Sequence, residues 1–499
     1  MQRYESDLAR TCASLSLAGS LAFSPALAAA ATAGTPPAPG PGAEPAAPAG
    51  ASVQAPAAEA AREPLRDQLR DSGCRTLAAR VAAIPGSGPV MLASYEAAPG
   101  GTPLPGPLQQ TAFVYDNALA GIALIACGQR DAARRIADGV VAGVARDRHY
   151  HDGRIRNAYR AGALPEGPLP LPGWWDDRSK RWFEDNYQAG TATGNVVWAA
   201  LLVLAAYEAT RAQRYLDTAT TLMNWVERNT WNGDPPGAYT GGFFGEEPQP
   251  RRQGWKSTEH NVDAYAAFRW LSRYDRDPRW QTGAARARQF VEAMWQAGEG
   301  RFAIGTRDDG RTLNAAPSAL DASLWPLIAI PDAAGGWRRS LDWARTRHGV
   351  KGGYGFKANP DGVWTEGTGQ AALVLRASER DDEARPLWAL LLSQRAPSGM
   401  LFATPEARIG TGLSIGPDST SEDFYYFHLP HLGATAWAVL AAAGWNPFQP
   451  GGCLGARCDG QRSRAGRAAA SVAATVAATS AATSAAAPNA ARGDSLTKE

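Results

Sequence analysis

The sequence lacks the short motifs that mark several common kinds of functional site. It contains no Cys-x-x-Cys pair and no His-Glu-x-x-His, and its polar groups are scattered, which argues against a zinc site. No glycine-rich loop of the kind that cradles phosphate groups is present either. We therefore expect neither a metal ion nor a cofactor.

The chain also lacks a strong excess of charge and long apolar runs. Its 50 Lys and Arg against 48 Asp and Glu leave a net charge of +2, which gives no electrostatic case for nucleic acid or an anionic membrane. Beyond the first 30 residues, no uninterrupted apolar run reaches the roughly 20 residues that span a membrane. We expect no nucleic-acid partner and no stable membrane insertion, and the oligomeric state stays open.

The two ends of the chain differ in composition from the rest. Residues 1–28 combine Arg3 and Arg10 with an apolar stretch and a small-residue cleavage site, which predicts a signal peptide and a periplasmic or secreted protein. An Ala-rich leader that is not a signal is the alternative. Residues 29–62 form an Ala/Pro/Gly-rich linker and residues 459–499 a disordered Ala/Ser-rich tail.

Cysteines are few, and five are present in all. Export would remove Cys12 with the signal. Cys453 and Cys458 flank a short turn and could form a disulfide bond in an oxidising compartment, although the sequence leaves this pairing open.

Two kinds of helix alternate between residues 65 and 448. Amphipathic helices are predicted near 65–82, 129–146, 213–230, 278–295, 336–347 and 382–394, and helices that are apolar on nearly every side near 111–127, 196–207, 259–274, 318–330, 366–378 and 432–443. A helix without a polar face must be surrounded by protein. The pattern predicts an all-α (α/α)6 toroid of six inner and six outer helices, with the helix near 65–82 closing the ring.

An open solenoid is the alternative architecture. Solenoid repeats keep a nearly constant length and a short recurring motif. The loops here vary widely in length and no motif recurs. The closed ring is therefore the better prediction.

The long loops all precede the buried helices, so a closed ring brings their polar residues together at one mouth. Glu259 and Glu366 are the leading catalytic candidates, because each follows a threonine able to cap its helix and each has a tryptophan upstream. Helix-start glutamates are also favoured simply by the helix dipole. Asp116, Asp263 and Asp321 lie within apolar helices, where an aspartate is costly unless it is paired or faces water.

Further residues near the mouth combine aromatic rings with hydrogen-bonding groups, a mixture that suits a sugar. His260 and His431 each begin a buried helix, though either could be an ordinary core histidine. The expected substrate-binding residues are Tyr115, Asn117, Trp175, Asp185, Tyr187, Trp255, His260, Asp321, Trp364, Tyr425 and His431.

With these carboxylates at the starts of its inner helices, the chain resembles the six-hairpin glycosidase superfamily of carbohydrate-active (α/α)6 toroids. The resemblance covers the helical core and rests on architecture rather than on a diagnostic motif. It implies an enzyme that acts on a polysaccharide or oligosaccharide, and it favours inversion of the anomeric centre.

Four functions follow as hypotheses. The first is an exported glycoside hydrolase with Glu259 as acid and Glu366 as its partner, in which His260 and Asp263 tune the acid and Asp116 and Asp185 hold hydroxyl groups. The second is a polysaccharide lyase with Tyr187, His260 or His431 as base and Arg251, Arg252 or Lys256 as neutralising cation. The third is a sugar 2-epimerase that uses His260 and His431. The fourth is a non-catalytic glycan-binding protein.

Overall fold

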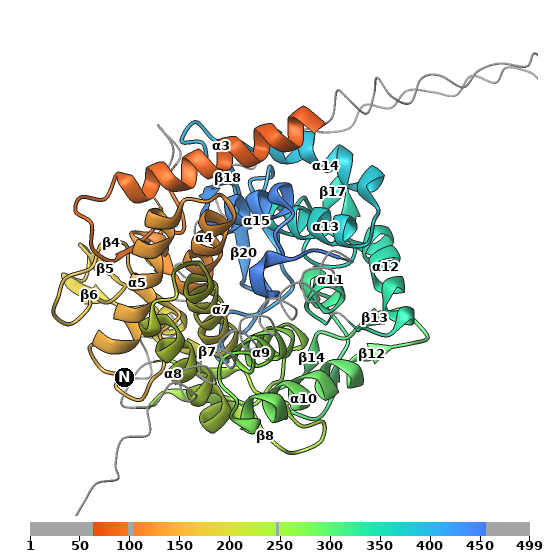
Figure 1. Ribbon diagram of the computed structural model, residues 1–499, viewed down its shortest axis with the longest axis horizontal. Coiled ribbons are helices and arrows are strands. Elements are labelled where there is room, and N and C mark those ends of the chain that lie inside the picture. The colour runs from red at the N-terminus through yellow and green to blue at the C-terminus, as the bar shows by residue number, and fades with distance from the viewer. Residues whose placement is uncertain (1–62, 98–103, 246–248, 331, 456–499) are drawn as a thin grey trace, which may run out of the picture.

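The chain folds into two concentric rings of helices, seen from one end in Figure 1 of the computed structural model. The structure describes residues 63–97, 104–245, 249–330 and 332–455. The predicted signal peptide, the linker and the C-terminal tail from residue 459 lie outside these ranges, as does Cys458.

The inner ring consists of the six predicted buried helices, and each packs against the next until the last meets the first. They are α4 (Val114–Ala126), α7 (Thr193–Thr210), α9 (Thr258–Leu271), α11 (Leu320–Ala329), α13 (Thr365–Ala377) and α15 (Leu432–Ala443). Helix α7 is the one described helix long and apolar enough to cross a membrane, and most of it is buried inside the ring.

The outer ring consists of the six amphipathic helices, which turn their apolar stripes inward. They are α3 (Glu63–Ala82), α5 (Arg130–Arg146), α8 (Gln213–Thr230), α10 (Pro278–Ala293), α12 (Arg339–His348) and α14 (Asp381–Ser393). Helix α3 packs against α15, α14 and α4, so the first described helix closes the ring as predicted. The (α/α)6 toroid is therefore confirmed.

Short antiparallel strands, which the sequence did not reveal, organise many of the connecting loops. They form nine two-stranded sheets and one three-stranded sheet among the described residues. The two-stranded pairs are β1 (Val90–Met91) with β4 (Gly162–Ala163), β2 (Thr111–Phe113) with β3 (Ala158–Arg160), β5 (Trp174–Asp176) with β6 (Arg181–Phe183), β8 (Trp231–Asn232) with β9 (Ala238–Tyr239), β12 (Trp295–Gln296) with β13 (Arg301–Phe302), β14 (Gly305–Thr306) with β15 (Leu313–Asn314), β16 (Gly349–Val350) with β17 (Gly353–Tyr354), β18 (Leu401–Phe402) with β21 (Pro430–His431), and β19 (Arg408–Gly410) with β20 (Tyr425–Phe427). The three-stranded sheet joins β7 (Thr191–Ala192), β10 (Gly242–Phe244) and β11 (Arg251–Gln253).

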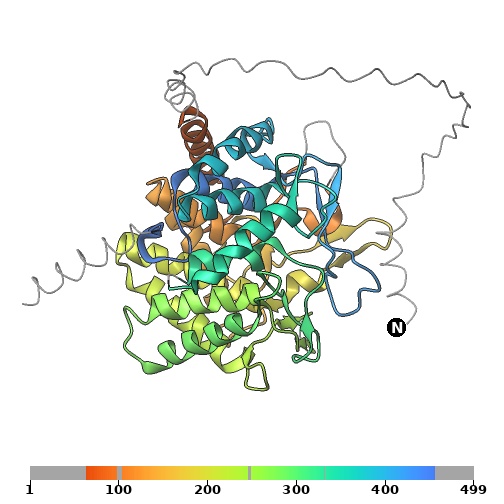
Figure 2. The same cartoon turned by 90° about the vertical axis from the view of Figure 1, so that its right-hand side faces the viewer.

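The two ends of the ring are built differently. Figure 2 shows hairpins gathered at one end, which we call the mouth, and the short helix η4 (Pro450–Gly452) at the other, which we call the far end. The mouth lies where the inner helices begin, because the long loops run into their N-termini. Two further short helices, α6 (Asn186–Ala189) and η2 (Gly106–Leu108), lie in these loops, and η3 (Gly335–Arg338) precedes α12.

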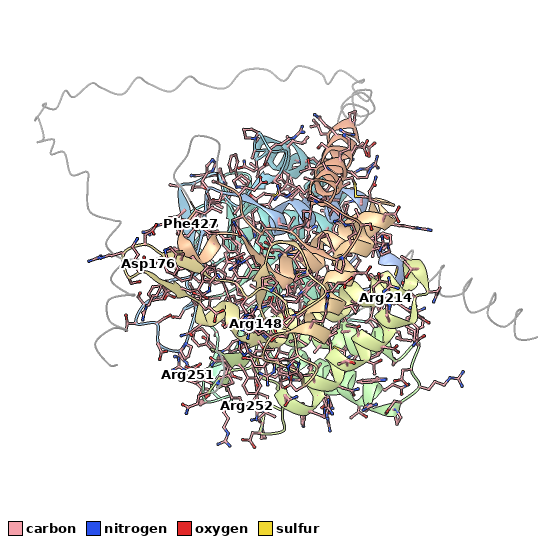
Figure 3. The ribbon with its side chains drawn as sticks, turned by 90° about the vertical axis from the view of Figure 1, so that its left-hand side faces the viewer. Arg148, Asp176, Arg214, Arg251, Arg252 and Phe427 are labelled. Carbon is pink, nitrogen blue, oxygen red and sulfur yellow. A yellow bond between two sulfur atoms is a disulfide. The ribbon has the colours of Figure 1, made fainter. Side chains whose placement is uncertain are left out.

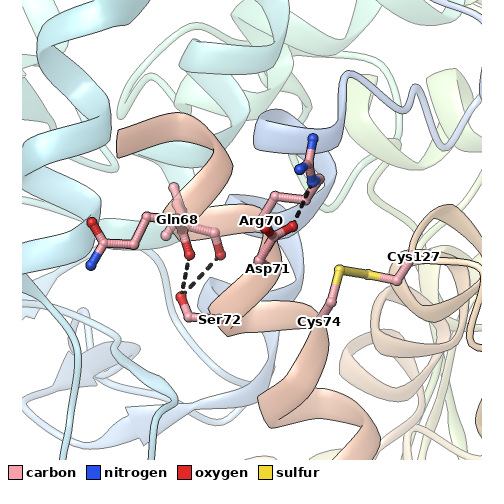
Figure 4. The surroundings of a disulfide bond; sticks show 7 residues. Gln68, Arg70, Asp71, Ser72, Cys74 and Cys127 are labelled. Carbon is pink, nitrogen blue, oxygen red and sulfur yellow. Dashed lines mark hydrogen bonds and ion pairs between the residues drawn. A yellow bond between two sulfur atoms is a disulfide. The ribbon is translucent and has the colours of Figure 1, made fainter. Parts of the chain in front are cut away.

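A disulfide bond joins the two rings, and it was not predicted. Cys74 in the middle of α3 is bonded to Cys127, the residue that follows α4 (Figure 4). The outer helix that closes the ring is thus covalently tied to the first inner helix.

The floor beneath the mouth is aromatic. Trp198, Trp325 and Trp437 occupy the sixth position of three alternating inner helices, and their ring centroids lie 5.6–5.9 Å apart. Phe448 packs against Trp198 and Trp325 at 5.2 and 5.3 Å. These four rings form a layer across the centre of the ring.

Candidate active site

Five carboxyl groups from four inner helices line the bottom of the mouth. They belong to Asp116, Glu259, Asp263, Asp321 and Glu366. Four are buried, and Glu259 alone keeps partial access to solvent. The second residue of each inner helix shows how the carboxyl groups find space. In α9, α11 and α13 this residue carries a carboxyl group, whereas in α7 and α15 it is a glycine, Gly194 or Gly433.

Two side chains donate hydrogen bonds to Glu366, and a third supports one of them. The hydroxyl of Tyr115 donates to its Oε1 at 2.6 Å, and the amide of Gln370 donates to the same oxygen at 3.4 Å. The indole of Trp437 donates in turn to the Tyr115 hydroxyl at 2.9 Å. This chain of donors fixes Glu366 above the aromatic floor.

His431 bridges two of the carboxyl groups. Its Nε2 lies 3.4 Å from Asp116 and its Nδ1 lies 3.8 Å from Glu366. The same Nδ1 accepts from the backbone N–H of Ala434 at 3.3 Å, so His431 also caps α15. Because Nδ1 is an acceptor, the neutral imidazole carries its proton on Nε2. Tyr95 stacks on the imidazole with centroids 4.4 Å apart. No sequence pattern had indicated Tyr95, because it lies far from His431 in the sequence and reaches it only through an isolated antiparallel bridge between the two residues.

The two glutamates have different electrostatic surroundings. Burial raises the pKa of Glu366 to about 7, with His431 opposing the rise, Asp116 adding to it and the Tyr115 hydrogen bond lowering it. Burial raises the pKa of Glu259 well above its usual range, and Asp321, Asp263 and Glu366 raise it further. Glu259 has no positive group among these causes, so it holds its proton more firmly than Glu366 does.

The remaining titratable groups of the cluster are also perturbed. Burial raises the pKa of Asp321 to about 6, against a 2.6 Å hydrogen bond from the N–H of Ala322. Burial and then Asp321 raise the pKa of Asp263, while the nearby Trp198 indole lowers it. Burial would lower the pKa of His431, but Asp116 and Glu366 raise it overall. Burial lowers the pKa of His260 to about 4, so this imidazole is neutral at pH 7.

Several polar atoms beneath the mouth have no hydrogen-bond partner of regular geometry. They include both carboxyl oxygens of Asp263, which is fully buried, and the Nε1 atoms of Trp198 and Trp325. The second oxygen of Glu366 and Nδ1 of His260 are in the same state. The Trp198 indole nonetheless lies next to Asp263 and lowers the pKa of its carboxyl group, so this pair links the carboxyl cluster to the aromatic floor.

Some predicted substrate-binding residues have structural roles instead. Asn117 is fully buried, and its amide bonds to both backbone groups of Leu92 and to the carbonyl of Phe113. Asp185 caps α6 by accepting from the N–H of Gln188 at 3.0 Å. Trp364 is buried and packs against Phe356 and Tyr426. The contacts of these three residues support structural roles and not the binding of substrate.

The predicted capping by threonine is wrong for both glutamate helices. Ser257 caps α9, and its hydroxyl accepts from the N–H of His260, whereas Thr258 donates to the carbonyl of Ala303. Helix α13 follows Trp364 without any side-chain cap. The glutamates nonetheless lie in the first turns, because each helix begins one residue before its glutamate.

The other predicted residues lie around the rim. Trp255 packs against the His260 ring at 5.3 Å, and Tyr187 lies 6.2 Å from Phe113. The Tyr425 ring is covered by Arg408 at 4.7 Å, and its hydroxyl donates to the carbonyl of Glu422. Trp175 stands on the exposed face of the β5–β6 hairpin.

The expectation that the chain has no motif of a nucleophilic serine is wrong, because one match is present. Residues Gly412 to Gly416 fit Gly-x-Ser-x-Gly, which marks a nucleophilic serine when it joins a strand to a helix. Here it lies in the loop between β19 and β20, and Ser414 donates to the carbonyl of Ser421. The structural context does not support a nucleophile.

The far end has its own hollow, of about 520 Å³, lined by residues such as Trp445, Arg130 and Arg273. Its carboxylate, Glu208, already accepts from the side chains of Trp270 and Tyr274 and from the N–H of Gly451. A carboxylate satisfied in this way serves packing. Within the described ranges, no group of three His, Cys, Asp or Glu residues is arranged to hold a metal ion.

The architecture is that of the six-hairpin (α/α)6 toroids, and comparison with solved structures agrees. Similar structures include a glycosidase variant in complex with glucose, 13% identical with a TM-score of 0.50 over 77% of this chain and 98% of that one. Cellobiose 2-epimerases are similar too. The one from Spirochaeta thermophila is 12% identical with a TM-score of 0.51 over 80% and 99% of the two chains, and the one from Bacillus thermoamylovorans 11% with 0.50 over 75% and 98%. No protein-family model matches the sequence, and no curated protein sequence matches it significantly. At these identities the likeness shows the fold.

Proposed function

We propose that the chain is an exported glycoside hydrolase that acts on a polysaccharide or oligosaccharide with inversion. The observation that carries this proposal is the pair Glu259 and Glu366, whose surroundings favour different protonation states at the mouth of a glycosidase-like ring. Glycoside hydrolysis needs one carboxyl group that donates a proton and one carboxylate that activates water.

The surroundings assign the roles. Glu259 is the general acid, because burial and three neighbouring carboxyl groups keep it protonated and because it retains access to the mouth. Glu366 is the base, because Tyr115 donates to its carboxylate and His431 lies 3.8 Å away. Export is supported by the Cys74–Cys127 disulfide, since such bonds persist mainly in oxidising compartments.

The test is hydrolysis of a panel of neutral glycans by the wild type and by Glu259→Gln and Glu366→Gln. Each substitution is expected to lower kcat/KM by about 10²- to 10⁴-fold, in line with the loss of an acid or base catalyst. Glu299→Gln is the control, because the exposed carboxylate of Glu299 pairs with Arg301 of β13, outside the carboxyl cluster. The pairing is wrong if both variants keep substantial activity. Inversion is read from the anomer that proton NMR detects first.

The lyase alternative gains little support. A lyase needs a cation to neutralise the uronate carboxylate, but Lys256 is turned to the carbonyls of Asp234 and Pro236. Arg251 pairs with Asp418. The pKa values of Asp321 and Glu366 are raised only to about 6 and about 7, so both groups are ionised above neutral pH, and this negative charge favours neutral sugars over uronates. Incubation with uronate-containing glycans should therefore give no unsaturated products that absorb in the ultraviolet.

A sugar 2-epimerase is the second candidate, and the two histidines favour it. His260 is neutral with an unpartnered Nδ1, whereas the pKa of His431 is raised, as a base and an acid would require. Epimerisation takes up deuterium from D2O at C2 and leaves the number of reducing ends unchanged. Hydrolysis raises the number of reducing ends, so one incubation with cellobiose or mannobiose in D2O separates the two reactions.

A further inference from the structure

The large apolar side chains that the described residues expose all lie in mouth loops. They are Trp175 and Trp182, with 53% and 44% of their surface exposed, and Leu313 and Ile415. Each precedes an inner helix in the chain. The two tryptophans are the largest of the four and stand on one hairpin, β5–β6, which also carries Asp176, labelled at the mouth end in Figure 3.

The hairpin sorts its side chains by face. Trp175 pairs directly with Trp182 across the two strands, and Trp174 pairs with Phe183 on the opposite face. The Trp174–Phe183 face is stacked at 5.9 Å and packs against η2, where Trp174 lies close over Gly106. Successive strand residues point to opposite faces, so packing of the Trp174–Phe183 face against η2 directs Trp175 and Trp182 outward.

The outward rings are fixed but not covered. The guanidinium of Arg160 lies over one face of Trp182 at 4.6 Å, and the Trp175 indole N–H donates to Asp177 at 3.1 Å. Among the described residues, the Trp175 ring makes no aromatic or cation–π contact. Directly opposed residues have Cβ atoms about 5 Å apart, so the two rings present neighbouring apolar faces.

The exposed area limits what can bind there. Together the two side chains expose about 240 Å², taking ~250 Å² for a whole tryptophan. A stable protein interface needs about 800 Å² per partner, several times more. Two adjacent rings edged by Arg, Lys and Asp side chains suit the C–H faces and hydroxyl groups of neighbouring sugar units.

The hairpin is continuous with the carboxyl cluster. Two residues separate β6 from α6, which carries Tyr187. Burial, and after it the charges of Glu259 and Asp116, raise the pKa of Tyr187 to about 12, so this ring lies within electrostatic reach of the catalytic candidates. A chain bound on the tryptophans can therefore extend along this segment toward Glu259.

We propose that Trp175 and Trp182 form a docking platform for a neutral glycan chain, outside the catalytic cluster, which makes a polymer the preferred substrate. The inference rests on the proposed function for its ligand class. Its site is separate, however, and binding there needs no turnover.

The experiment is affinity electrophoresis of the full chain carrying Glu259→Gln, in gels that contain a β-glucan, an α-glucan, a mannan or a xylan. We expect at least one polysaccharide to retard the protein. Adding Trp175→Ala and Trp182→Ala should weaken that binding at least tenfold, and Phe at both positions should restore part of it. Ile415→Ala, which removes a comparably exposed apolar side chain from another mouth loop, should leave retardation unchanged.

Three results would overturn the platform. The first is retardation that persists in the double Ala variant, and the second is no retardation by any of the four polymers. The third is sedimentation of the chain as a dimer that the double variant abolishes, which would assign the rings to self-association. Hydrolysis is measured in a separate assay. The retardation can therefore be interpreted even if the catalytic proposal fails. Thermal unfolding of each variant checks its fold.

Discussion

At the scale of single residues, Glu366 sets the expected dependence of activity on pH. As the base it must be ionised, and burial raises its pKa to about 7. Activity should therefore fall as pH drops below about 7, and it should fall again at the higher pH where Glu259 loses its proton. A profile of kcat/KM between pH 4 and 10 tests this; a profile flat from pH 5 to 7 contradicts the role of Glu366.

Tyr115 should shift that acidic limb. Its hydroxyl donates to Glu366 and lowers the carboxyl pKa, so Tyr115→Phe should move the limb to higher pH. We expect about a tenfold loss of kcat/KM at pH 6, equivalent to one pKa unit, and a smaller loss at pH 8.5. Tyr274→Phe, which removes a similar hydroxyl–carboxylate bond at the far end, is the matched control. An equal loss at both pH values would mean that Tyr115 acts in another way.

The same carboxyl group should also make stability depend on pH. The pKa of Glu366 rises from 4.5 to about 7 on folding, so its contribution to stability is full below about pH 4.5 and is lost as pH rises through 7. Relative to wild type, Glu366→Gln should therefore be more stable at pH 8 than at pH 5, by up to about 3 kcal/mol. Urea unfolding at the two pH values measures this, with Glu299→Gln as the control. A difference that does not change with pH rules out the proposed titration.

At the scale of elements, the second position of each inner helix decides whether the cluster can assemble. Gly433 begins α15 so close to its neighbours that an added Cβ would lie 2.6 Å from Asp116 and 2.9 Å from Glu366. Gly433→Ala should therefore lower kcat/KM at least tenfold by displacing these carboxyl groups. Gly121→Ala meets the Leu202 side chain at 2.5 Å deeper in α4, and it should reduce stability with much less effect on catalysis. Equal effects on activity would show that the clash is merely structural.

The elements also show how far the sequence could be interpreted. The alternation of amphipathic and apolar helices predicted the ring, because inner helices have no polar face and outer helices keep one. The first-turn positions of Glu259 and Glu366 were predicted from capping threonines, and the positions are right although the caps are not. The functions of Asn117 and Trp364 were not predicted, because a polar or aromatic residue beside a helix start can equally tie down a loop. Tyr95 and the Cys74–Cys127 bond depend on contacts between segments whose packing no local pattern specifies.

At the scale of the whole molecule, the ring must be closed, and the Cys74–Cys127 disulfide fastens the closure. The bond spans 53 residues, and removing it frees the unfolded chain, which corresponds to about 4 kcal/mol in the loop-entropy model. Replacing both cysteines with alanine should lower Tm by roughly 5 °C in a domain of this size. Activity at 25 °C should persist, because Cys127 follows the end of α4 that is remote from the mouth. Calorimetry of the double variant beside the wild type measures the effect. An unchanged Tm would mean that packing of α3 against α15 and α14 closes the ring without help from the disulfide.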